Sequence, residues 1–263
     1  MDYDDAYANA PYIAGAEDYP DRWLAASRSW AAGQAALGRR QEDIPYGPSG
    51  RQRFDFFTPP GTAKGVLIFV HGGYWLRFDR AYWFHLGQGA MAQGWAVAMP
   101  SYDLCPEVRI AEITRQIAAA VEVAAGMADG PIILAGHSAG GHLVSRMLAP
   151  GMLSPEVAAR LQHVMPISPV SDLRPLLHTT MNDDFRMDEA SAAAESPVLM
   201  TDRLDVPVTV WVGADERPVF LDQARWLAEA WGAAHVVDEG KHHFDVIDGL
   251  IDPESRMVQT LLS

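Results

Sequence analysis

The segment ILAGHSAGGHLV (133–144) places one serine between glycines in the middle of an apolar run. In the pattern Gly-x-Ser-x-Gly, here GHSAG (136–140), a strand turns sharply into a helix and the turn holds the serine hydroxyl clear of the sheet. Glycines allow the strand and the helix to approach without side-chain clashes. A serine without a chemical role at a glycine-flanked helix start is the alternative. The apolar run before the turn favours a nucleophile, Ser138.

Strand and helix patterns alternate on both sides of this segment. Short apolar or alternating runs predict strands over 53–57, 65–71, 95–100, 131–136, 163–168, 207–213 and 234–238. Helical spacing predicts helices over 80–92, 109–125, 140–148, 219–231 and 252–262, the last with Asp252 as its N-cap. The alternation predicts an α/β fold with a mostly parallel central sheet and helices on both faces. Reactive groups of such sheets gather beyond the carboxyl ends of the strands.

Length and composition indicate one globular unit. The chain has 263 residues, 49% of them hydrophobic, and no Pro/Gly/Ser-rich linker divides it, so we expect a single domain over 1–263. Residues 1–40 are rich in alanine and aromatic residues, and Trp23, Ala26 and Trp30 share a helical face. We therefore expect a helix over 21–37 and a partly helical N-terminal cover over the rest of the molecule.

The charge balance restricts the partners. With 20 Lys and Arg against 34 Asp and Glu, the formal net charge is −14, which disfavours nucleic acid and anionic membranes. No apolar run reaches the ~18 residues of a membrane span, and the N-terminus does not resemble a signal peptide, so a cytoplasmic protein is expected. The single cysteine, Cys105, forms no intramolecular disulfide and is interpreted as structural. The oligomeric state stays open, with a homodimer as one alternative.

A nucleophilic serine needs a base, and in this fold the chain order is serine, acid, histidine. Five histidines follow Ser138: His163, His178, His235, His242 and His243. His242 and His243 come directly after the last predicted strand, at its carboxyl end. We choose His243 because Phe244 and an apolar helix face follow it, with His242 as the alternative.

The acid is expected after the strand over 207–213, in the sequence GADERP (213–218). Asp215 and Glu216 are both candidates. The spacing from Gly213 favours Glu216, although either carboxylate could orient the imidazole.

The sequence HGGYW (71–75) follows the strand over 65–71, where hydrolases of this type place oxyanion-hole amides. We expect the amides of Gly72, Gly73 and Tyr74 to act with that of Ala139. Tyr74 and Trp75 are interpreted as lining an aromatic substrate pocket, with a core position as the alternative. No metal-ligand spacing, phosphate loop or dinucleotide motif occurs, so no metal or cofactor is expected.

These motifs resemble the α/β-hydrolase superfamily and, within it, the kynurenine formamidase (arylformamidase) group with its related esterases. The resemblance runs from about residue 45 to the end. It rests on HGGYW, GHSAGGHL (136–143), YDLCPE (102–107) and HHFDVI (242–247). Residues 169–203 are similar to that group's short cap-like insertion. GADERPVF (213–220) is similar to the family stretch that carries the acid, which again selects Glu216, although the family usually has aspartate there.

The resemblance implies a serine hydrolase with a Ser-His-acid triad that acts on a small molecule without a cofactor. N-formyl arylamides are the expected substrates, with N-formyl-L-kynurenine first among them. A carboxylesterase or thioesterase acting on small acyl groups uses the same residues and is the alternative. A non-catalytic binding protein on the same fold is a third. Arg77, Arg109 and Arg174 are candidates for contacting a substrate carboxylate, and surface charge is the favoured interpretation for each.

Overall fold

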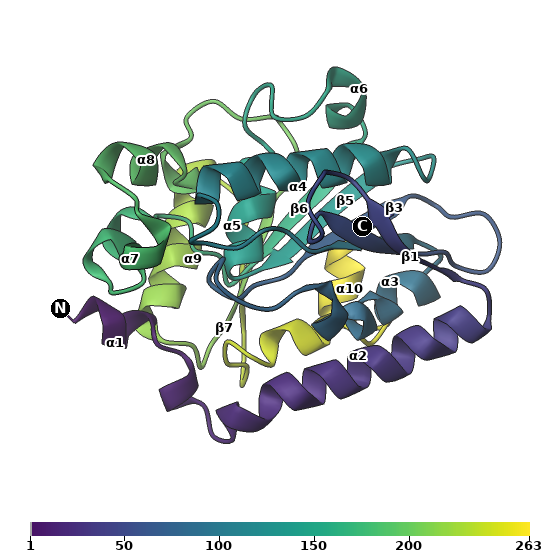
Figure 1. Ribbon diagram of the computed structural model, residues 1–263, viewed down its shortest axis with the longest axis horizontal. Coiled ribbons are helices and arrows are strands. Elements are labelled where there is room, and N and C mark those ends of the chain that lie inside the picture. The colour runs from purple at the N-terminus through teal and green to yellow at the C-terminus, as the bar shows by residue number, and fades with distance from the viewer. Residues whose placement is uncertain (1) are drawn as a thin grey trace.

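The computed structural model describes residues 2–263, which form one eight-stranded sheet in the order β1-β2-β4-β3-β5-β6-β7-β8 (Figure 1). β1 and β2 pair antiparallel, as do β2 and β4, and the other neighbours are parallel. The strands are β1 (Arg40–Pro45), β2 (Arg53–Phe57), β3 (Val66–Val70), β4 (Ala96–Pro100), β5 (Ile132–His137), β6 (Leu161–Ile167), β7 (Thr209–Gly213) and β8 (Ala234–Asp238). The expected α/β fold with a mostly parallel sheet is confirmed.

Helices and short 3₁₀ turns connect the strands. The helices are α1 (Tyr3–Tyr7), α2 (Tyr19–Ala36), α3 (Gln88–Ala92), α4 (Ile110–Ala125), α5 (Ala139–Arg146), α6 (Pro155–Ala158), α7 (Asn182–Phe185), α8 (Glu189–Ala194), α9 (Pro218–Trp231) and α10 (Arg256–Leu261). The 3₁₀ turns are η1 (Ala10–Tyr12), η2 (Ala16–Asp18), η3 (Arg80–Tyr82), η4 (Phe84–Gly87), η5 (Arg174–His178), η6 (Pro197–Leu199) and η7 (Val246–Leu250).

The sheet has an apolar core on each face because successive side chains of a strand point to opposite sides. In β3, Val66, Ile68 and Val70 join the core beneath α4, α5 and α9, whereas Leu67 and Phe69 join the core beneath α2, α3 and α10. Figure 1 shows α4 and α2 on opposite sides of the sheet. Covering on both faces explains why β3, β4 and β5 are buried along their whole lengths.

One strand was not predicted, and two local predictions differ from the structure. β1 has the polar sequence RQEDIP and is mostly exposed at the sheet edge, so no apolar pattern marks it. The expected helix over 80–92 is divided into η3, η4 and α3. The last helix begins at Arg256 and not near Asp252, because Ser255 accepts the cap hydrogen bond from the Val258 amide.

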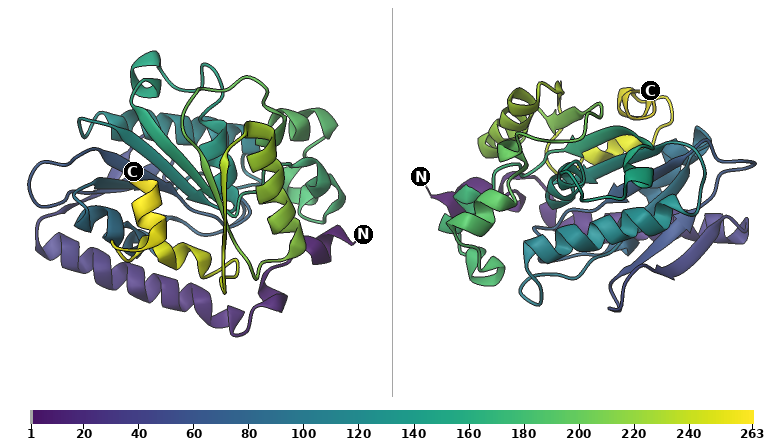
Figure 2. Two further views of the ribbon diagram at one scale, coloured as in Figure 1. Left: turned by 180° about the vertical axis from the view of Figure 1, so that it is seen from behind. Right: turned by 90° about the horizontal axis from the view of Figure 1, so that it is seen from above.

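The N-terminal segment lies at the same end of the molecule as the segment between β6 and β7. In Figures 1 and 2, α1 lies beside α7 and α9, and α2 then runs along the sheet on one side. The chain between β6 and β7 contains η5, α7, α8 and η6. The expected helix over 21–37 corresponds to α2, which spans Tyr19–Ala36.

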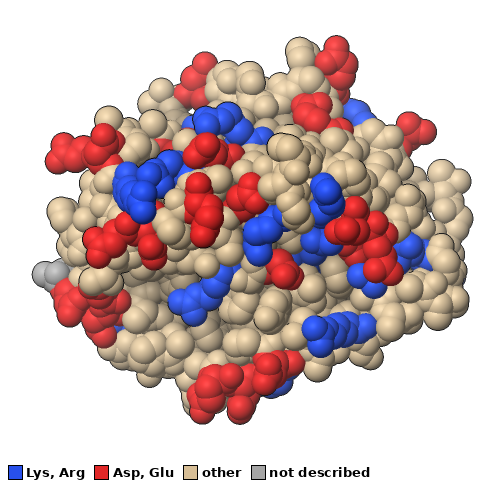
Figure 3. Space-filling model, in the orientation of Figure 1, with Lys and Arg blue, Asp and Glu red and all other residues tan. Residues whose placement is uncertain are grey.

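Acidic and basic side chains are mixed on the face drawn in Figure 3, so the excess of acid does not form one continuous patch there. Within residues 2–263, no helix is both long enough and apolar enough to cross a membrane.

Candidate active site

Ser138 lies on the turn between β5 and α5, with φ +56° and ψ −116°. The turn requires close backbone approach on both sides of the serine. A Cβ on Gly140 would lie 2.0 Å from the Val70 carbonyl oxygen, and one on Gly136 would lie 2.2 Å from the Gly140 oxygen. The Ser138 amide donates to the Ile167 oxygen at 2.8 Å, which ties the turn to β6. Both glycines of the motif are therefore needed for contact between elements.

His243 and Glu216 form a buried pair. The Nδ1–H of His243 donates to Glu216 Oε2 at 2.6 Å, and the two side chains are 4% and 0% exposed. Because a carboxylate only accepts hydrogen bonds, this contact fixes the proton on Nδ1 and leaves Nε2 free to take another. The His243 ring lies between Phe220, at 4.3 Å between ring centres, and His137, at 4.6 Å. This packing holds the imidazole in one orientation.

The other oxygen of Glu216 is also held. Oε1 accepts from the Gly213 amide at 3.0 Å and from the Ser168 hydroxyl. A buried carboxylate requires such donors to offset its lost hydration. Asp215, the alternative acid, is exposed on the neighbouring position, and its amide donates to the Lys241 oxygen. Glu216 is thus the carboxylate that contacts His243.

His242 occupies a different environment. Its Nε2 lies 3.2 Å from the Tyr19 hydroxyl, and its Nδ1 accepts from the Phe244 amide at 3.1 Å. These contacts fix a turn and tie α2 to it, and they point to a structural position for His242.

A cavity of about 640 Å³ brings Ser138 and His243 together. Its lining includes the residues that follow β3, namely Gly72, Gly73 and Tyr74. Residues of the N-terminal segment, such as Tyr7, Asn9 and Trp23, line it as well. Its surface is mainly apolar and aromatic, as is typical of small-molecule sites.

The prediction that Trp75 lines the pocket is wrong. Its side chain is fully buried, 5.2 Å from the His142 ring and 5.7 Å from the Phe185 ring. Trp75 has φ +58°, so the chain turns at this residue and the indole packs into the core. The core alternative is the correct one, whereas Tyr74 does line the cavity.

The loop over 72–74 lies against the serine turn. A Cβ on Gly72 would be 2.9 Å from the His137 oxygen and 3.1 Å from Ser138 Cβ. Gly73 has φ +118°, a conformation open to glycine. Ala139, the fourth expected oxyanion residue, is the first residue of α5 and is buried beside the turn. Gly72, Gly73 and Tyr74 thus line the same cavity as Ser138, and Ala139 follows the serine directly in the chain.

Two buried histidines near the turn stay neutral. Burial, with the adjoining His243 ring as a second cause, holds the pKa of His137 well below its ordinary value. Burial also lowers the pKa of His71 to about 4, and its Nδ1–H donates to the Gly72 oxygen at 2.7 Å. Neither ring adds positive charge beside Ser138. Cys105 is buried as well, and burial raises the pKa of its thiol to about 12, in line with a structural role.

The three candidate arginines differ in the groups that they contact. Arg174 pairs with Asp172 at 2.6 Å, and Arg109 donates to the Pro106 oxygen at the start of α4. Arg77 lines the cavity, and no carboxylate of residues 2–263 lies within salt-bridge distance of it. Glu17 lines the same cavity.

Sequence reasoning missed Ser168 and the cavity residues of the N-terminal segment. Ser168 directly follows β6, and its place beyond the carboxyl end of a strand was an available signal. Tyr7 and Asn9 carry no such signal, because more than a hundred residues separate them from Ser138.

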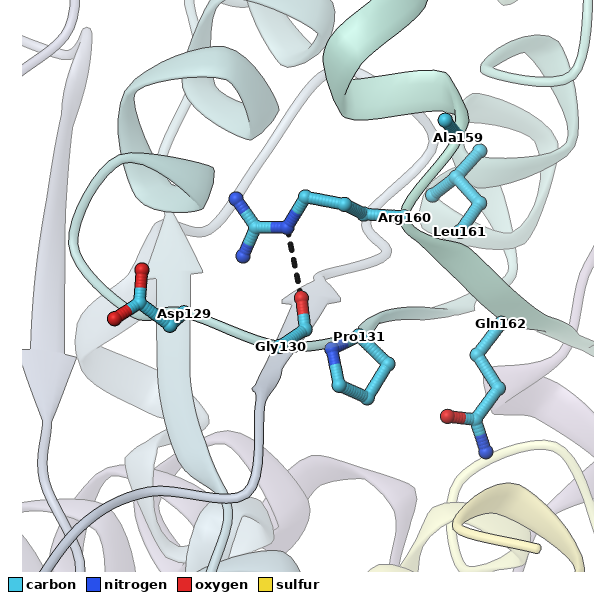
Figure 4. Close-up of a pocket in the computed structure, with 7 residues that line it drawn as sticks. All are labelled: Asp129, Gly130, Pro131, Ala159, Arg160, Leu161 and Gln162. Atoms are coloured by element: carbon cyan, nitrogen blue, oxygen red, sulfur yellow. Dashed lines mark hydrogen bonds between the residues drawn. The ribbon is translucent and has the colours of Figure 1, made fainter.

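A second hollow, of about 560 Å³, lies at the opposite end of the sheet, between 129–131 and 159–162 (Figure 4). The Arg160 guanidinium donates there to the oxygens of Gly130, Ala125 and Ala128. Arg160 thus caps the end of α4, and its hydrogen-bonding capacity is used within the chain. In the part of the chain that the structure describes, no group of three His, Cys, Asp or Glu side chains is placed to hold a metal.

The chain is similar in sequence to known proteins. A family model described as alpha/beta hydrolase fold matches residues 67–243. Kynurenine formamidase of Danio rerio is 25% identical over 237 residues, 84% of this chain and 80% of the relative. Kynurenine formamidase of Drosophila melanogaster is 27% identical over 232 residues, 79% of this chain and 75% of the relative.

Solved structures are similar over nearly the whole chain. A candidate thioesterase from Silicibacter sp. TM1040 superposes with a TM-score of 0.98 at 57% identity, with both chains fully covered. Esterase B from Lactobacillus rhamnosis superposes with a TM-score of 0.67 at 18% identity over 92% of each chain, a likeness of fold alone. The chain therefore belongs to the alpha/beta hydrolase fold family, and it is a hydrolase with kynurenine formamidases among its sequence relatives.

Proposed function

We propose that Ser138, His243 and Glu216 form the catalytic triad of a serine hydrolase that acts on N-formyl arylamides, with N-formyl-L-kynurenine as the leading substrate. The observation that carries this proposal is the buried His243–Glu216 pair, whose histidine lines the same cavity as Ser138.

Acylation proceeds in the usual order for a triad. The Ser138 hydroxyl attacks the formyl carbon while His243 Nε2 takes its proton. The negative charge of Glu216 stabilises the imidazolium. Amides of Gly72, Gly73, Tyr74 and Ala139 donate to the oxyanion of the tetrahedral intermediate. His243 then gives the proton to the aryl amine nitrogen as the C–N bond breaks.

Deacylation repeats these roles with water. His243 takes a proton from water, and the hydroxide attacks the formyl ester on Ser138. The intermediate collapses with the proton returned to Ser138, and formate leaves. No redox step or cofactor enters the balance.

The cavity supports an aromatic amino-acid substrate. Trp23, Phe78 and Trp83 supply aromatic surface. Arg77 supplies a positive charge, and Asp4 and Glu17 supply negative charges. N-formyl-L-kynurenine carries an aryl formamide, a carboxylate and an ammonium group, which these three features complement. The kynurenine formamidase relatives, which match about four-fifths of this chain, point the same way.

A carboxylesterase or thioesterase is the second candidate function. The specific observation in its favour is the 57% identity to the candidate thioesterase structure. The triad does not discriminate, because the same residues cleave amides, esters and thioesters.

We also propose that the chain works as one domain, with the N-terminal 1–40 as a partial cover of the site and 169–203 as a cap-like insertion. The N-terminal lining of the cavity supports the first, and Thr180 and Met181, which also line it, support the second.

The experiment compares kcat/KM for N-formyl-L-kynurenine, p-nitrophenyl acetate and a short acyl thioester. The expected result is that wild type has its highest kcat/KM on the formamide. Ser138→Ala should lower this kcat/KM by at least ~10⁴-fold. Glu216→Gln lowers it by about 10²–10⁴-fold, whereas the exposed control Asp215→Asn leaves it near wild type. Full turnover by Ser138→Ala would refute the mechanism. Dominant thioester or ester turnover would transfer the substrate assignment to the second candidate.

A further inference from the structure

The loop that holds the expected oxyanion amides has an unusual backbone. Gly73, Tyr74 and Trp75 have φ values of +118°, +55° and +58°. Tyrosine and tryptophan rarely adopt positive φ, and such a run persists only where the surrounding structure holds it.

Trp75 and Tyr74 are held by different parts of the chain. Trp75 is fixed by the core, between His142 and Phe185. The hydroxyl of Tyr74 donates to the Tyr7 backbone oxygen at 2.7 Å and accepts from Asn9 Nδ2 at 2.9 Å. Tyr74 is thus tied to the N-terminal segment at both its donor and its acceptor.

The N-terminal segment is itself firmly anchored at this point. Tyr7 is 1% exposed and Asn9 is 3% exposed. The Tyr7 hydroxyl accepts from Gln223 Nε2 of α9 at 2.7 Å, and its ring packs on Phe220 at 5.9 Å. Phe220 in turn packs on His243. A segment of a few residues therefore contacts both the oxyanion loop and the helix that supports the base.

We propose that Asn9 and the backbone carbonyl of Tyr7 are positioning residues, which act through the Tyr74 hydroxyl to hold the amides of Gly72, Gly73 and Tyr74 where the oxyanion forms. This inference rests on the proposed function, because it requires a reaction with an oxyanion. It gives the N-terminal segment a part in catalysis in addition to its place in the cavity wall.

The physical consequence is a selective loss of turnover. Oxyanion donors stabilise the tetrahedral species more than the bound substrate, so their displacement lowers kcat and leaves KM nearly unchanged. A shift of about 1 Å in such a group costs on the order of a hundredfold. Loss of packing in the cavity wall would raise KM instead.

The test uses Tyr74→Phe, Asn9→Leu and the double variant, with kcat and KM measured on N-formyl-L-kynurenine and p-nitrophenyl acetate. Tyr46→Phe is the matched control, because the buried Tyr46 hydroxyl donates to the Ser101 oxygen and does not line the cavity. Melting temperatures of all variants report the cost in stability.

The expected result for Tyr74→Phe is a kcat lowered about ten- to hundredfold with KM within threefold of wild type. Tyr46→Phe keeps the wild-type kcat although its melting temperature is similar to that of Tyr74→Phe. Asn9→Leu gives a smaller loss, and the double variant is no slower than Tyr74→Phe, because both changes break one linkage.

Two results would overturn the proposal. One is a folded Tyr74→Phe with kcat within twofold of wild type, and the other is a raised KM at unchanged kcat. If Tyr74→Phe does not fold, the kcat of Asn9→Leu decides in the same way. Failure here is distinct from failure of the proposed function, since the latter requires that Ser138→Ala stay active.

Discussion

Glu216 shows how one charged side chain is held in an apolar interior. Its carboxylate receives His243 on one oxygen and Gly213 with Ser168 on the other. Ser168 has φ +47°, and its amide donates to the Trp211 oxygen at 2.6 Å, which ties the backbone of Ser168 to β7. The orientation of the carboxylate therefore depends on Ser168 at the end of β6 and on Gly213 at the end of β7.

We predict that Ser168→Ala lowers kcat about tenfold with little change in KM. A hydrogen bond to a charged group contributes about 1.5–3 kcal/mol, and the Gly213 amide retains part of the hold on Glu216. Steady-state kinetics on wild type and variant, with circular dichroism to confirm folding, measures the effect. An unchanged kcat would show that Ser168 does not help to orient Glu216.

We predict that Gly140→Ala destabilises the fold by about 2 kcal/mol and strongly lowers kcat. The new Cβ would meet the Val70 and His71 oxygens at 2.0 and 2.6 Å, so α5 and the Ser138 turn must shift. Gly126→Ala is the control, because its Cβ would meet its nearest neighbour, the Val123 oxygen, at 3.4 Å. Urea unfolding and kinetics on both variants measure the difference, and equal behaviour of the two would contradict the explanation.

At the scale of elements, α10 shows how capping decides a helix boundary. The sequence DPESRM (252–257) offers two cap residues, and the proline after Asp252 favoured the first. In the structure the Asp252 side chain accepts from the Glu254 amide at 2.9 Å and forms a turn, whereas Ser255 accepts from Val258 at 3.0 Å and begins the helix. The two side chains offer competing local hydrogen bonds, and the prediction chose Asp252 where the structure has Ser255 as the N-cap.

We predict that Ser255→Ala lowers the free energy of unfolding by about 1 kcal/mol, the usual cost of losing an N-cap. Asp252→Ala lowers it by less than half as much. Urea denaturation of the two variants side by side measures the order. A larger effect at Asp252 would mean that the helix in solution begins three residues earlier.

At the scale of the whole molecule, burial on both faces of the sheet leaves several histidines away from water. His85, in η4, is 7% exposed, and burial lowers its pKa from 6.5 to about 4. The unfolded chain binds a proton below about pH 6.5, and the folded chain does so only near pH 4. Between these values unfolding takes up a proton, so the free energy of unfolding falls as the pH falls.

We predict that His85→Phe weakens this dependence. Between pH 7 and pH 5, wild type should lose about 2 kcal/mol more of its free energy of unfolding than the variant does. Urea denaturation at the two pH values measures the difference. Parallel losses in the two proteins would show that His85 is not held neutral by burial.

Much of the architecture was predictable because it is written in local patterns. Buried parallel strands such as β3 and β5 are continuous apolar runs, and α4 and α9 have apolar faces at helical spacing. β1 escaped because its polar residues pair along an exposed edge, where burial imposes no pattern. The interval 80–92 has helical composition, yet only Gln88–Ala92 forms an α-helix, and the residues before it form the 3₁₀ turns η3 and η4.

The strand–turn–helix at Ser138 and the alternation of strands and helices follow from the amino-acid sequence, because both depend on neighbours in the chain. The spacing from Gly213 also favoured Glu216 over Asp215 as the partner of His243. The tertiary structure alone brought Ser168 to Glu216 and packed Trp75 into the core. It also brought Tyr7 and Asn9 to Tyr74. These contacts join residues tens of positions apart, and packing of separate elements sets their distances, which no local pattern records.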